Sequence, residues 1–499
     1  MKRSVKSFVC PVLITLLVLL TACDKRLEEI NRDPLGLDDL SDEYFFNTGL
    51  RMAFGDYFWL RSFQMRFASQ YSHVYVTSTE MRNADSYEDF HSQDVYKEMF
   101  QAAYTGPAVY MNKVVSMTAG GEHENNVRNA IARIVSAVIF ATITDCYGDV
   151  PYSEGAKGMD GILYPKYDSQ EFIYSDMMEQ LKTAIEVLKT ADPSRGYVNA
   201  DPVYDNDLSK WVRFANSLRL RLAMRSRFAS PAKSAAIITE CFANSFIETN
   251  DQNFAWKHQD SENSELYNPW FDVHRNEDFR MSEKFVDWLS STNDPRLEIL
   301  VSPVPGRGYV GIPNGLSSLQ VGNYPWANYS KPSPALYARD LPQTLLCASE
   351  VWFLRAEAAL FGLAPGDPNE FYREGIIRNL EFWNADPAET NTFLTDEPEA
   401  TLSGTIENMF RQISTQMWIA FVPNFVEAWS NIRRTGFPVI PQRTNAEIFS
   451  LGVTNGILPK RFKYATNEYL TNGINLQAAI DRQGPDKIDT PVWWDVLDR

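Results

Sequence analysis

Apolar residues recur along much of the chain at the spacing of an amphipathic helix. Between residues 126 and 146, four of them fall at positions i, i+3, i+4 and i+7: Ile131, Ile134, Val135 and Val138. This spacing places them on one helical face, and Gly148 with Pro151 predicts the end of the helix. The same pattern predicts further helices at residues 171–189, 210–227, 282–290, 348–361, 369–383, 406–432 and 474–482.

Consecutive amphipathic helices favour a mostly α fold of packed αα-hairpins, and a short superhelical array is one arrangement that they allow. No tetratricopeptide consensus recurs at constant spacing. Between residues 250 and 341 the pattern changes, because Pro, Gly, Asn and aromatic residues crowd together. We expect a loop-rich insertion there, carried by a helical scaffold, and binding residues tend to lie in such loops.

The N-terminus has the pattern of an export signal. Three cations precede an apolar run from Val9 to Leu20, which has the length of a signal-peptide core but is short for a membrane span. The run leads into Leu20-Thr21-Ala22-Cys23, which resembles the lipobox of bacterial lipoproteins, whose cysteine thiol receives diacylglycerol. An ordinary signal peptide with a chance cysteine is the alternative.

This interpretation divides the chain into three parts. Residues 1–22 are expected to form a lipoprotein signal peptide, residues 23–39 a lipidated N-terminus and polar tether, and residues 40–499 the folded body. We expect no membrane-spanning segment in the body. The acyl chains on Cys23 would therefore be its only attachment to a membrane.

Composition and charge narrow the class of protein. The chain has 499 residues, of which 44% are hydrophobic and 22% charged, as in a globular protein with a large core. Its net charge of −17 disfavours a polyanionic partner, so we expect no nucleic-acid binding. The later cysteines are too widely spaced for a metal knuckle or a redox pair, and we expect free, buried thiols at Cys146, Cys241 and Cys347.

Motifs for catalysis are weak. Gly306 to Gly311 spells GxGxxG, but Pro313 opposes the helix that a dinucleotide fingerprint requires, so a glycine-rich turn is favoured. Ser230 and Lys233 form an SxxK sequence without its usual partner motifs, and serine followed by proline is typical of a helix start. The five histidines form no close pair, and the sequence predicts neither a metal site nor a cofactor.

Paired carboxylates are typical of a glycosidase, in which two of them face each other across a cleft. Asp145, Asp149 and Glu154 flank the end of a predicted helix. This arrangement is typical of turn and packing residues at a helix C-terminus, which is the interpretation that we favour. The sequence therefore predicts no enzyme.

Several segments, taken in order, resemble one family. Asp145 to Glu154 reads DCYGDVPYSE and is similar to the family's D-x-Y-G-D-x-P-Y-S-E, and Tyr167 to Tyr174 follows at the expected distance. Further similar blocks are Trp211 to Arg225, Asn293 to Leu297, Glu350 to Ala358, Glu427 to Trp429, Arg433 to Gly436 and Pro491 to Asp495. Over nearly its whole mature length, the chain resembles the SusD and RagB family of outer-membrane lipoproteins.

The resemblance implies a core of four tetratricopeptide-like helix pairs, with long irregular loops and a second, less regular subdomain. It also implies a nutrient-binding lipoprotein of the outer membrane, exposed at the cell surface, that captures oligosaccharide or peptide. The implied partner is a SusC-like TonB-dependent β-barrel transporter, which the lipoprotein covers as a lid and to which it delivers the ligand.

Charged residues within these blocks also have a structural interpretation. Arg219, Arg221 and Arg225 alternate with apolar residues along a predicted helix. We expect them to pair with the acids between residues 350 and 357 across a helix interface, which would make them part of the scaffold.

The ligand site is predicted from the needs of a sugar. Neutral sugars present C–H faces and hydroxyl groups, so their binding surface needs exposed aromatic rings beside short polar side chains. The candidates are the aromatic residues in loop-like sequence: Trp59, Tyr267, Trp270, Tyr324, Trp326 and Tyr329. Asn268, Asn323 and Asn328 are their neighbours in sequence. For each ring, packing onto the helical core is the alternative.

Two other classes of protein stay open at this point. An exported hydrolase of glycans or peptides would turn over its ligand. A purely structural surface lipoprotein would bind no ligand. Ligand binding and turnover are therefore the two properties that separate the three hypotheses.

Overall fold

The computed structural model describes residues 40–55, 60–77, 82–89, 95–263, 266–275 and 279–497 of the chain. The predicted signal peptide, the lipidation site Cys23, the tether and the candidate Trp59 lie outside the described residues. The chain divides into two units, residues 1–44 and 45–499, and the second holds nearly all of the described residues.

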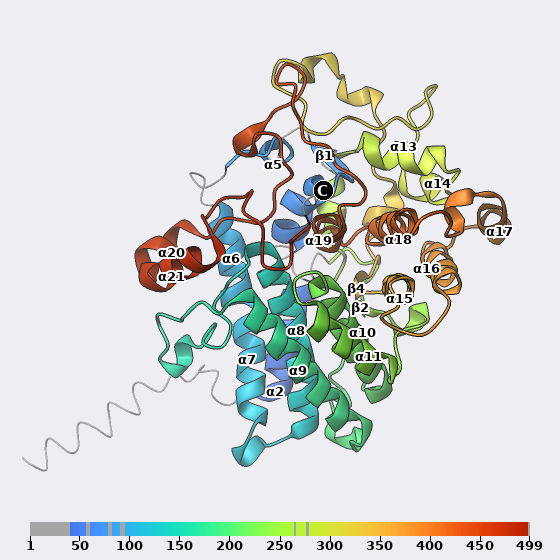
Figure 1. Cartoon of the computed structure of the whole chain (residues 1–499). Coiled ribbons are helices and arrows are strands. Elements are labelled where there is room, and N and C mark those ends of the chain that lie inside the picture. The colour runs from blue at the N-terminus through green and yellow to red at the C-terminus, as the bar shows by residue number, and fades with distance from the viewer. Residues whose placement is uncertain are drawn as a thin grey trace, which may run out of the picture. The chain divides into compact units, whose positions relative to one another are not determined.

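Helices make up most of the described chain (Figure 1). The first half contains α2 (Asp42–Leu50), α4 (Ser69–Tyr71), α5 (Arg82–Asp85), α6 (Val95–Thr105), α7 (Pro107–Thr118), α8 (Asn126–Tyr147), α9 (Gln170–Lys189), α10 (Leu208–Ser226) and α11 (Pro231–Phe242), with π-helical segments at Arg51–Gly55 and Leu60–Ala68. The second half contains α12 (Trp270–Arg275), α13 (Glu283–Ser291), α14 (Arg296–Leu300), α15 (Ala348–Leu360), α16 (Pro368–Phe382), α17 (Pro387–Asp396), α18 (Ile406–Ala420), α19 (Phe425–Thr435), α20 (Thr466–Thr471) and α21 (Gly473–Gln483).

The strands of the described chain are short and form two ribbons. β1 (Tyr75–Thr77) pairs antiparallel with β3 (Phe279–Met281). β2 (Phe254–Trp256) pairs antiparallel with β4 (Gln343–Leu346). The two ends of the irregular region between these strands therefore lie side by side. The first ribbon then fastens the middle of this region to the N-terminal part of the fold.

The helix α8 illustrates why the predicted helices form. The side-chain oxygen of Asn125 accepts hydrogen bonds from the N–H groups of Val127 and Arg128, which caps the helix start. The helix ends at Gly148, whose φ of 80° suits glycine. Among the described helices α8 is the one long and apolar enough to cross a membrane, but 83% of its apolar window is buried inside the fold. We therefore assign it as a core helix.

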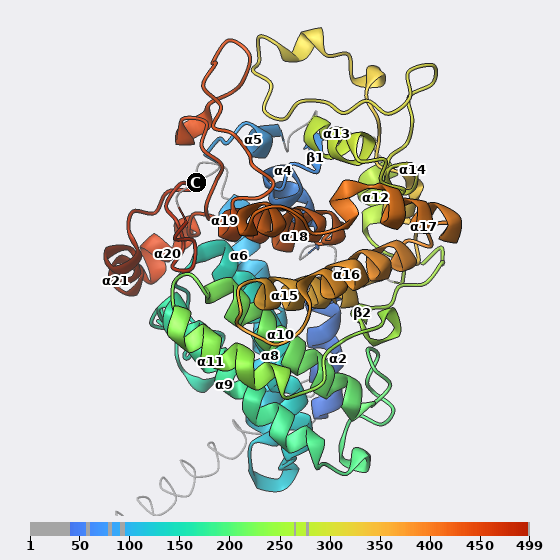
Figure 2. The same ribbon diagram turned by 45° about the vertical axis from the view of Figure 1, so that its right-hand side comes forward.

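Successive helices pack in pairs. α7 packs against α8, α9 against α10, α15 against α16, and α18 against α19. Further contacts of α8 with α9, and of α15 with α10 and α18, join the pairs into one array. Figure 1 shows α8, α9 and α10 side by side, and Figure 2 shows α15 between α10 and α16. The predicted mostly α fold of packed helix pairs is confirmed.

One predicted helix is wrong in its extent. The apolar pattern predicts a single helix over residues 406–432, whereas the structure has α18 and α19, separated by residues 421–424. Pro423 lies in this gap, and proline has no N–H to continue a helix and also disfavours helical backbone in the residue before it. The break lets α19 return along α18.

Buried ion pairs connect the helices. Arg221 of α10 pairs with Glu350 of α15 at 2.5 Å, as predicted, and also with Glu427 of α19 at 3.4 Å. The prediction is wrong for Arg225, which pairs with Glu427 and with Asp145 of α8. All five side chains are at most 9% exposed, so these charges join four helices in the interior.

Three further ion pairs lie next to this network. Arg219 pairs with Glu240 of α11 at 2.6 Å, so its predicted pairing with α15 is also wrong. Glu357 of α15 instead accepts from Arg227 at 2.8 Å and from Arg434 of α19 at 2.5 Å. Burial alone would raise the pKa of Glu357, but the positive charges of Arg434 and Arg227 lower it below its ordinary value.

The acidic residues at the end of α8 have structural roles. Asp145 is 1% exposed and accepts hydrogen bonds from Tyr174 and from the indole of Trp494. Asp149 accepts from the N–H of Gln170, at the start of α9. The packing interpretation is therefore confirmed for both carboxylates, which lie too deep in the fold to face each other across an open cleft.

The remaining sequence features have simple outcomes. All three described cysteines are free: Cys146 and Cys241 are buried, whereas Cys347 is partly exposed. Ser230 stands at the start of α11, although its side chain makes no capping hydrogen bond. The predicted free thiols and the predicted helix start at Ser230 are thus confirmed. Cys347 is less buried than expected.

Candidate functional site

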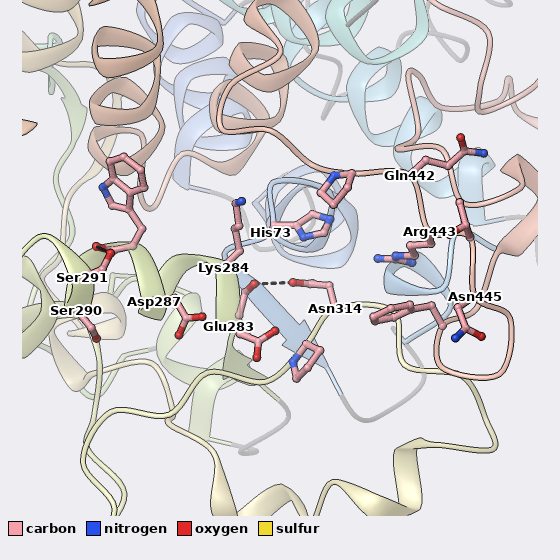
Figure 3. A pocket seen from close by; sticks show the side chains of 16 residues that line it. His73, Glu283, Lys284, Asp287, Ser290, Ser291, Asn314, Gln442, Arg443 and Asn445 are labelled. Atoms are coloured by element: carbon pink, nitrogen blue, oxygen red, sulfur yellow. Dashed lines mark hydrogen bonds between the residues drawn. The ribbon is translucent and has the colours of Figure 1, made fainter. Parts of the chain in front are cut away.

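A cavity of about 870 Å³ opens beside α13. Its walls come from α13, from the residue before α13, from the loops 313–314 and 441–449, and from His73 ahead of β1 (Figure 3). The lining residues are His73, Ser282, Glu283, Lys284, Asp287, Trp288, Ser290, Ser291, Pro313, Asn314, Pro441, Gln442, Arg443, Thr444, Asn445 and Phe449. Segments from early, middle and late in the chain therefore meet around one cavity.

The start of α13 is fastened to the other walls by hydrogen bonds. The N–H of Ser282 donates to the carbonyl of Val74 at 2.9 Å, and its hydroxyl donates to the side-chain oxygen of Asn314 at 2.6 Å. The N–H of Glu283 donates to the carbonyl of Ile312 at 2.9 Å. These bonds satisfy donors at the helix start and hold α13 against the 312–314 loop.

Asp85 joins two walls of the cavity. Its buried carboxylate accepts from the amide of Asn314 at 2.8 Å and from the N–H of Gly315 at 2.6 Å, and its carbonyl accepts from Arg443 at 2.6 Å. The Arg443 guanidinium also lies 3.8 Å from the ring centre of Tyr87. Gly315 has a φ of 71°, and a side chain there would collide with this guanidinium, so the loop approaches Arg443 closely only with glycine.

His73 lies between the two cationic residues of the cavity. Its Nε2 is 3.1 Å from the hydroxyl of Tyr87. Burial lowers the pKa of His73 well below its ordinary value, and the positive charges of Arg443 and Lys284 lower it further. The imidazole is therefore neutral at pH 7, and it contributes hydrogen-bonding capacity to the cavity without a charge.

Three charged groups on α13 line the cavity and have no ion-pair partner among the described residues. Glu283 and Asp287 are exposed and Lys284 is partly exposed, and none of the three has an ion pair with another described residue. Partial desolvation at the cavity wall raises the pKa of Glu283, as does the carboxylate of Asp287 one turn along the helix. In Figure 3, Glu283 and Asp287 extend from α13 while Arg443 reaches in from the opposite wall. These groups are available to hydrogen-bond a ligand.

The cavity also has apolar surface. Trp288 and Phe449 are both partly exposed in its lining, together with Pro313 and Pro441. Flat apolar surface beside unpaired polar groups is the combination that a ligand with both hydroxyl groups and C–H faces requires. The described residues contain no group of three or more His, Cys, Asp or Glu side chains arranged to hold a metal ion.

Three predicted aromatic residues lie together near the cavity. Tyr324, Trp326 and Tyr329 are half-buried and pack against one buried apolar cluster, which consists of Val76, Ile312 and Leu316. The rings of Tyr324 and Tyr329 stack with their centres 6.1 Å apart. Burial and the neighbouring Tyr324 raise the pKa of Tyr329, and the charge of Glu283 contributes. Ile312 of the apolar cluster accepts from the N–H of Glu283, so the cluster and its three rings lie beside the start of α13.

A family model described as "Starch-binding associating with outer membrane" matches residues 52–465. The chain belongs to this SusD-like family. A solved chitin-binding protein shares 27% sequence identity with this SusD-like chain, covers 92% of it over 100% of its own length and has a TM-score of 0.80. A SusD homologue from Bacteroides uniformis has the same identity and coverage, with a TM-score of 0.76.

More distant structures share the fold. A chitin-binding SusD homologue from Flavobacterium johnsoniae, at 24% identity, covers 92% of this chain over 99% of its own length, with a TM-score of 0.78. No curated protein sequence matches the chain. The family resemblance found in the sequence is therefore confirmed, and the fold extends over nearly the full length of the solved relatives.

Two predicted site residues of the SusD-like chain are not exposed platforms. Trp270 is 0% exposed, and its ring stacks on Phe425 with the centres 5.7 Å apart. Tyr267 is 8% exposed, and its hydroxyl donates to Asp272. The neighbouring Asn268 is fully buried. The prediction of exposure is wrong here because a large ring in irregular sequence gains as much free energy from burial as a ring on a helix.

Most of the cavity lining was not predicted from the sequence. The rings Trp288 and Phe449 and the cations Lys284 and Arg443 were not among the predicted site residues. A signal for α13 was available, because its exposed polar residues recur at i, i+4 and i+7 opposite its apolar face. The wall formed by residues 441–449 gave no signal, since it reaches the cavity through tertiary contacts alone.

Proposed function

We propose that the cavity beside α13 captures an oligosaccharide and that this SusD-like protein is a nutrient-binding lipoprotein of the cell surface. The observation that carries the proposal is one cavity in which unpaired polar groups surround partly exposed rings. Sugars need both kinds of surface. The starch-binding description of the family and the chitin-binding relative at 27% identity support a glycan ligand.

The arrangement of carboxylates favours binding over hydrolysis. Glu283 and Asp287 are four residues apart on one helix, so both extend from the same wall of the cavity. A glycosidase needs two carboxyl groups that flank the scissile bond from opposite sides. We therefore propose that these groups form hydrogen bonds with ligand hydroxyls. The alternative is a glycan- or peptide-degrading hydrolase, in which they would take part in bond cleavage.

The binding proposal is tested with a glycan array and a peptide library applied to the purified mature protein, followed by calorimetry and a time course. We expect binding of at least one neutral oligosaccharide and recovery of that ligand unchanged. Peptide binding alone would redirect the proposal to peptide capture. Product formation would support the hydrolase, and the absence of any ligand would support a structural lipoprotein.

The membrane attachment rests on Cys23. The lipobox-like sequence at residues 20–23 motivates lipidation, and the outer-membrane description of the family supports the location. Several acyl chains hold a protein on a bilayer far more firmly than one, so Cys23→Ala should release the protein or leave it unprocessed. A processed Cys23→Ala protein that stays at the membrane would contradict the anchor. Protease treatment of intact cells tests surface exposure separately.

The partner that we propose is a SusC-like TonB-dependent β-barrel transporter, for which this protein acts as a lid and to which it delivers the glycan. Family membership supports this proposal. Stable partners bury well over roughly 1,000 Å² together, so the complex should survive extraction in mild detergent. We expect a much larger β-barrel to co-purify from native membranes. Repeated recovery of the lipoprotein alone at normal expression would contradict the proposal.

A further inference from the structure

A second cavity lies at the other end of α13. Its volume is about 660 Å³, and its lining comes from α13, the segment after it, α14, α17 and Tyr309. Ser290 lines both cavities. Figures 1 and 2 agree in placing α13, α14 and α17 next to one another. The two cavities therefore meet at the last turn of α13.

A glycine-rich turn carries Tyr309 to this second cavity. The backbone groups of Val304 and Gly308 bond to each other at 2.7 and 3.1 Å, and Gly306 and Gly308 have φ values of 74° and 75°. The glycine-rich turn predicted from the GxGxxG sequence is therefore confirmed. In this structure the glycines form a tight turn and not a dinucleotide-binding loop. Tyr309 and Glu298 line the same cavity, and the charge of Glu298 adds to burial in raising the pKa of the Tyr309 phenol.

The same segment ends against Glu283, the first residue of α13. At its end, Gly311 packs so closely on the backbone of Glu283 that a side chain would collide there. Between the two ends, the N–H of Val310 donates to the hydroxyl of Ser330 at 3.0 Å, and Val310 accepts from the N–H of Ser330 at 2.8 Å. Residues 309–311 thus run along α13 from one cavity to the other. The hydrogen bonds to Ser330 hold them next to Tyr329, one of the predicted site residues.

The exposed charged groups that line the second cavity are carboxylates, which accept hydrogen bonds. Glu298, Glu389 and Asp396 are exposed in its lining, and none of them has an ion pair with another described residue. No lysine or arginine among the described residues lines it. Tyr309 and Leu297 add partly exposed apolar surface. Such a lining accepts hydrogen bonds from hydroxyl groups and repels carboxylate or sulfate groups.

We infer that the second cavity is a further subsite for the same neutral glycan chain, so that long oligosaccharides bind in both cavities and short ones in the first alone. This inference rests on the proposed function. Glu283, Asp287 and Ser290 form one exposed stripe on α13, and the seven-step rise along the helix from Glu283 to Ser290 is about 10 Å. A chain leaving the first cavity passes over Ser290 to stack on Tyr309.

Length-resolved calorimetry tests the inference. The probes are the malto-oligosaccharides and the chito-oligosaccharides from disaccharide to hexasaccharide, titrated into the full mature protein. In the series that binds, we expect the hexasaccharide to bind more tightly than the shorter members. Tyr309→Ala should remove this gain, with a loss of roughly three- to tenfold in hexasaccharide affinity, the size of one stacking contact. Tyr309→Phe keeps the ring and should keep most of the gain.

The control is Tyr164→Ala, since Tyr164 is 67% exposed and lines neither cavity. It should bind every oligosaccharide like the unmodified protein, and thermal denaturation checks that each variant is folded. Affinity that does not grow with chain length, or growth that survives Tyr309→Ala, would overturn the second subsite while leaving the first intact. If neither series binds at any length, the proposed function fails for these glycans and the subsite fails with it.

Discussion

Charged side chains occupy two contrasting regions of this SusD-like protein. Between the helix pairs, Glu357 and Glu427 are buried, and each is paired with two arginines. Beside α13, Glu283 and Asp287 are exposed at a cavity, and neither is ion-paired with another described residue. The same type of side chain therefore holds helices together in one region and is available to a ligand in the other.

The contrast separates charged residues of the scaffold from charged residues of the candidate site. A buried charge is stable only with its partners, so it belongs to the packing of the helices that it joins. An exposed, unpaired charge adds little to stability and leaves its hydrogen bonds to whatever enters the cavity. Substitutions in the first region should therefore lower the free energy of unfolding, and those in the second should lower ligand affinity.

The largest expected effect is at Glu357. Its replacement by Ala leaves Arg227 and Arg434 buried without their shared carboxylate, which should cost about 5 kcal/mol, the upper end for a broken buried ion pair. Urea denaturation of Glu357→Ala against the unmodified protein measures the loss. If the variant does not accumulate in folded form, Glu357→Gln gives a milder test. A loss below about 1 kcal/mol would show that this region resembles the surface.

Two tryptophans should differ in the stability that their replacement costs. Trp270→Ala should cost about 3 kcal/mol, the lower end for a buried tryptophan, because its Nε1 has no hydrogen-bond partner among the described residues. Trp326→Ala, at a half-buried ring, should cost about 1 kcal/mol or less. Thermal denaturation compares them directly. Equal losses would contradict the assignment of Trp270 to the core.

The pH dependence of stability follows from the lowered pKa of Glu357. Its folded pKa lies below its unfolded value of about 4.3, so its contribution is fully present above that pH and is lost as the pH falls through the folded pKa. Denaturation at pH 7 and about pH 3 should show a smaller acid-induced loss in Glu357→Gln than in the unmodified protein. The same loss in both would mean that Glu357 is not held by its arginines.

The smallest effect on stability is expected at the cavity. Glu283 repels Asp287 at i+4, and its pKa is raised, so Glu283→Gln should leave the free energy of unfolding within about 0.5 kcal/mol of the original or increase it slightly. Urea denaturation is again the measurement. A loss of more than about 2 kcal/mol would place Glu283 in the scaffold and remove the contrast between the two regions.

The helical scaffold was largely predictable because burial of one helix face leaves a local period in the sequence. The stripe at residues 126–146 predicted α8 together with its end at Gly148. The same apolar period continues across residues 421–424, so the sequence predicted one helix where the structure has α18 and α19. Pro423 was the local signal that should have outweighed the period.

The candidate site was predictable only in part. Tyr324, Trp326 and Tyr329 were named from their loop-like sequence, and the structure brings them together near the cavity. Trp270 also lies in loop-like sequence but is buried, because irregular backbone does not imply exposure. Arg443 was out of reach, since its place beside α13 depends on contacts with Asp85 and Gly315 that are distant in sequence.

The central claim is that the unpaired groups beside α13 bind the ligand, and calorimetry on Asp287→Ala tests it most directly. Glu179→Ala is the matched control, because Glu179 is an exposed carboxylate on α9 that lines neither cavity. With the best-binding oligosaccharide, Asp287→Ala should weaken binding about tenfold or more, the value of a hydrogen bond to a charged group, while Glu179→Ala leaves the affinity unchanged. Equal affinities of Asp287→Ala and the unmodified protein would contradict the claim.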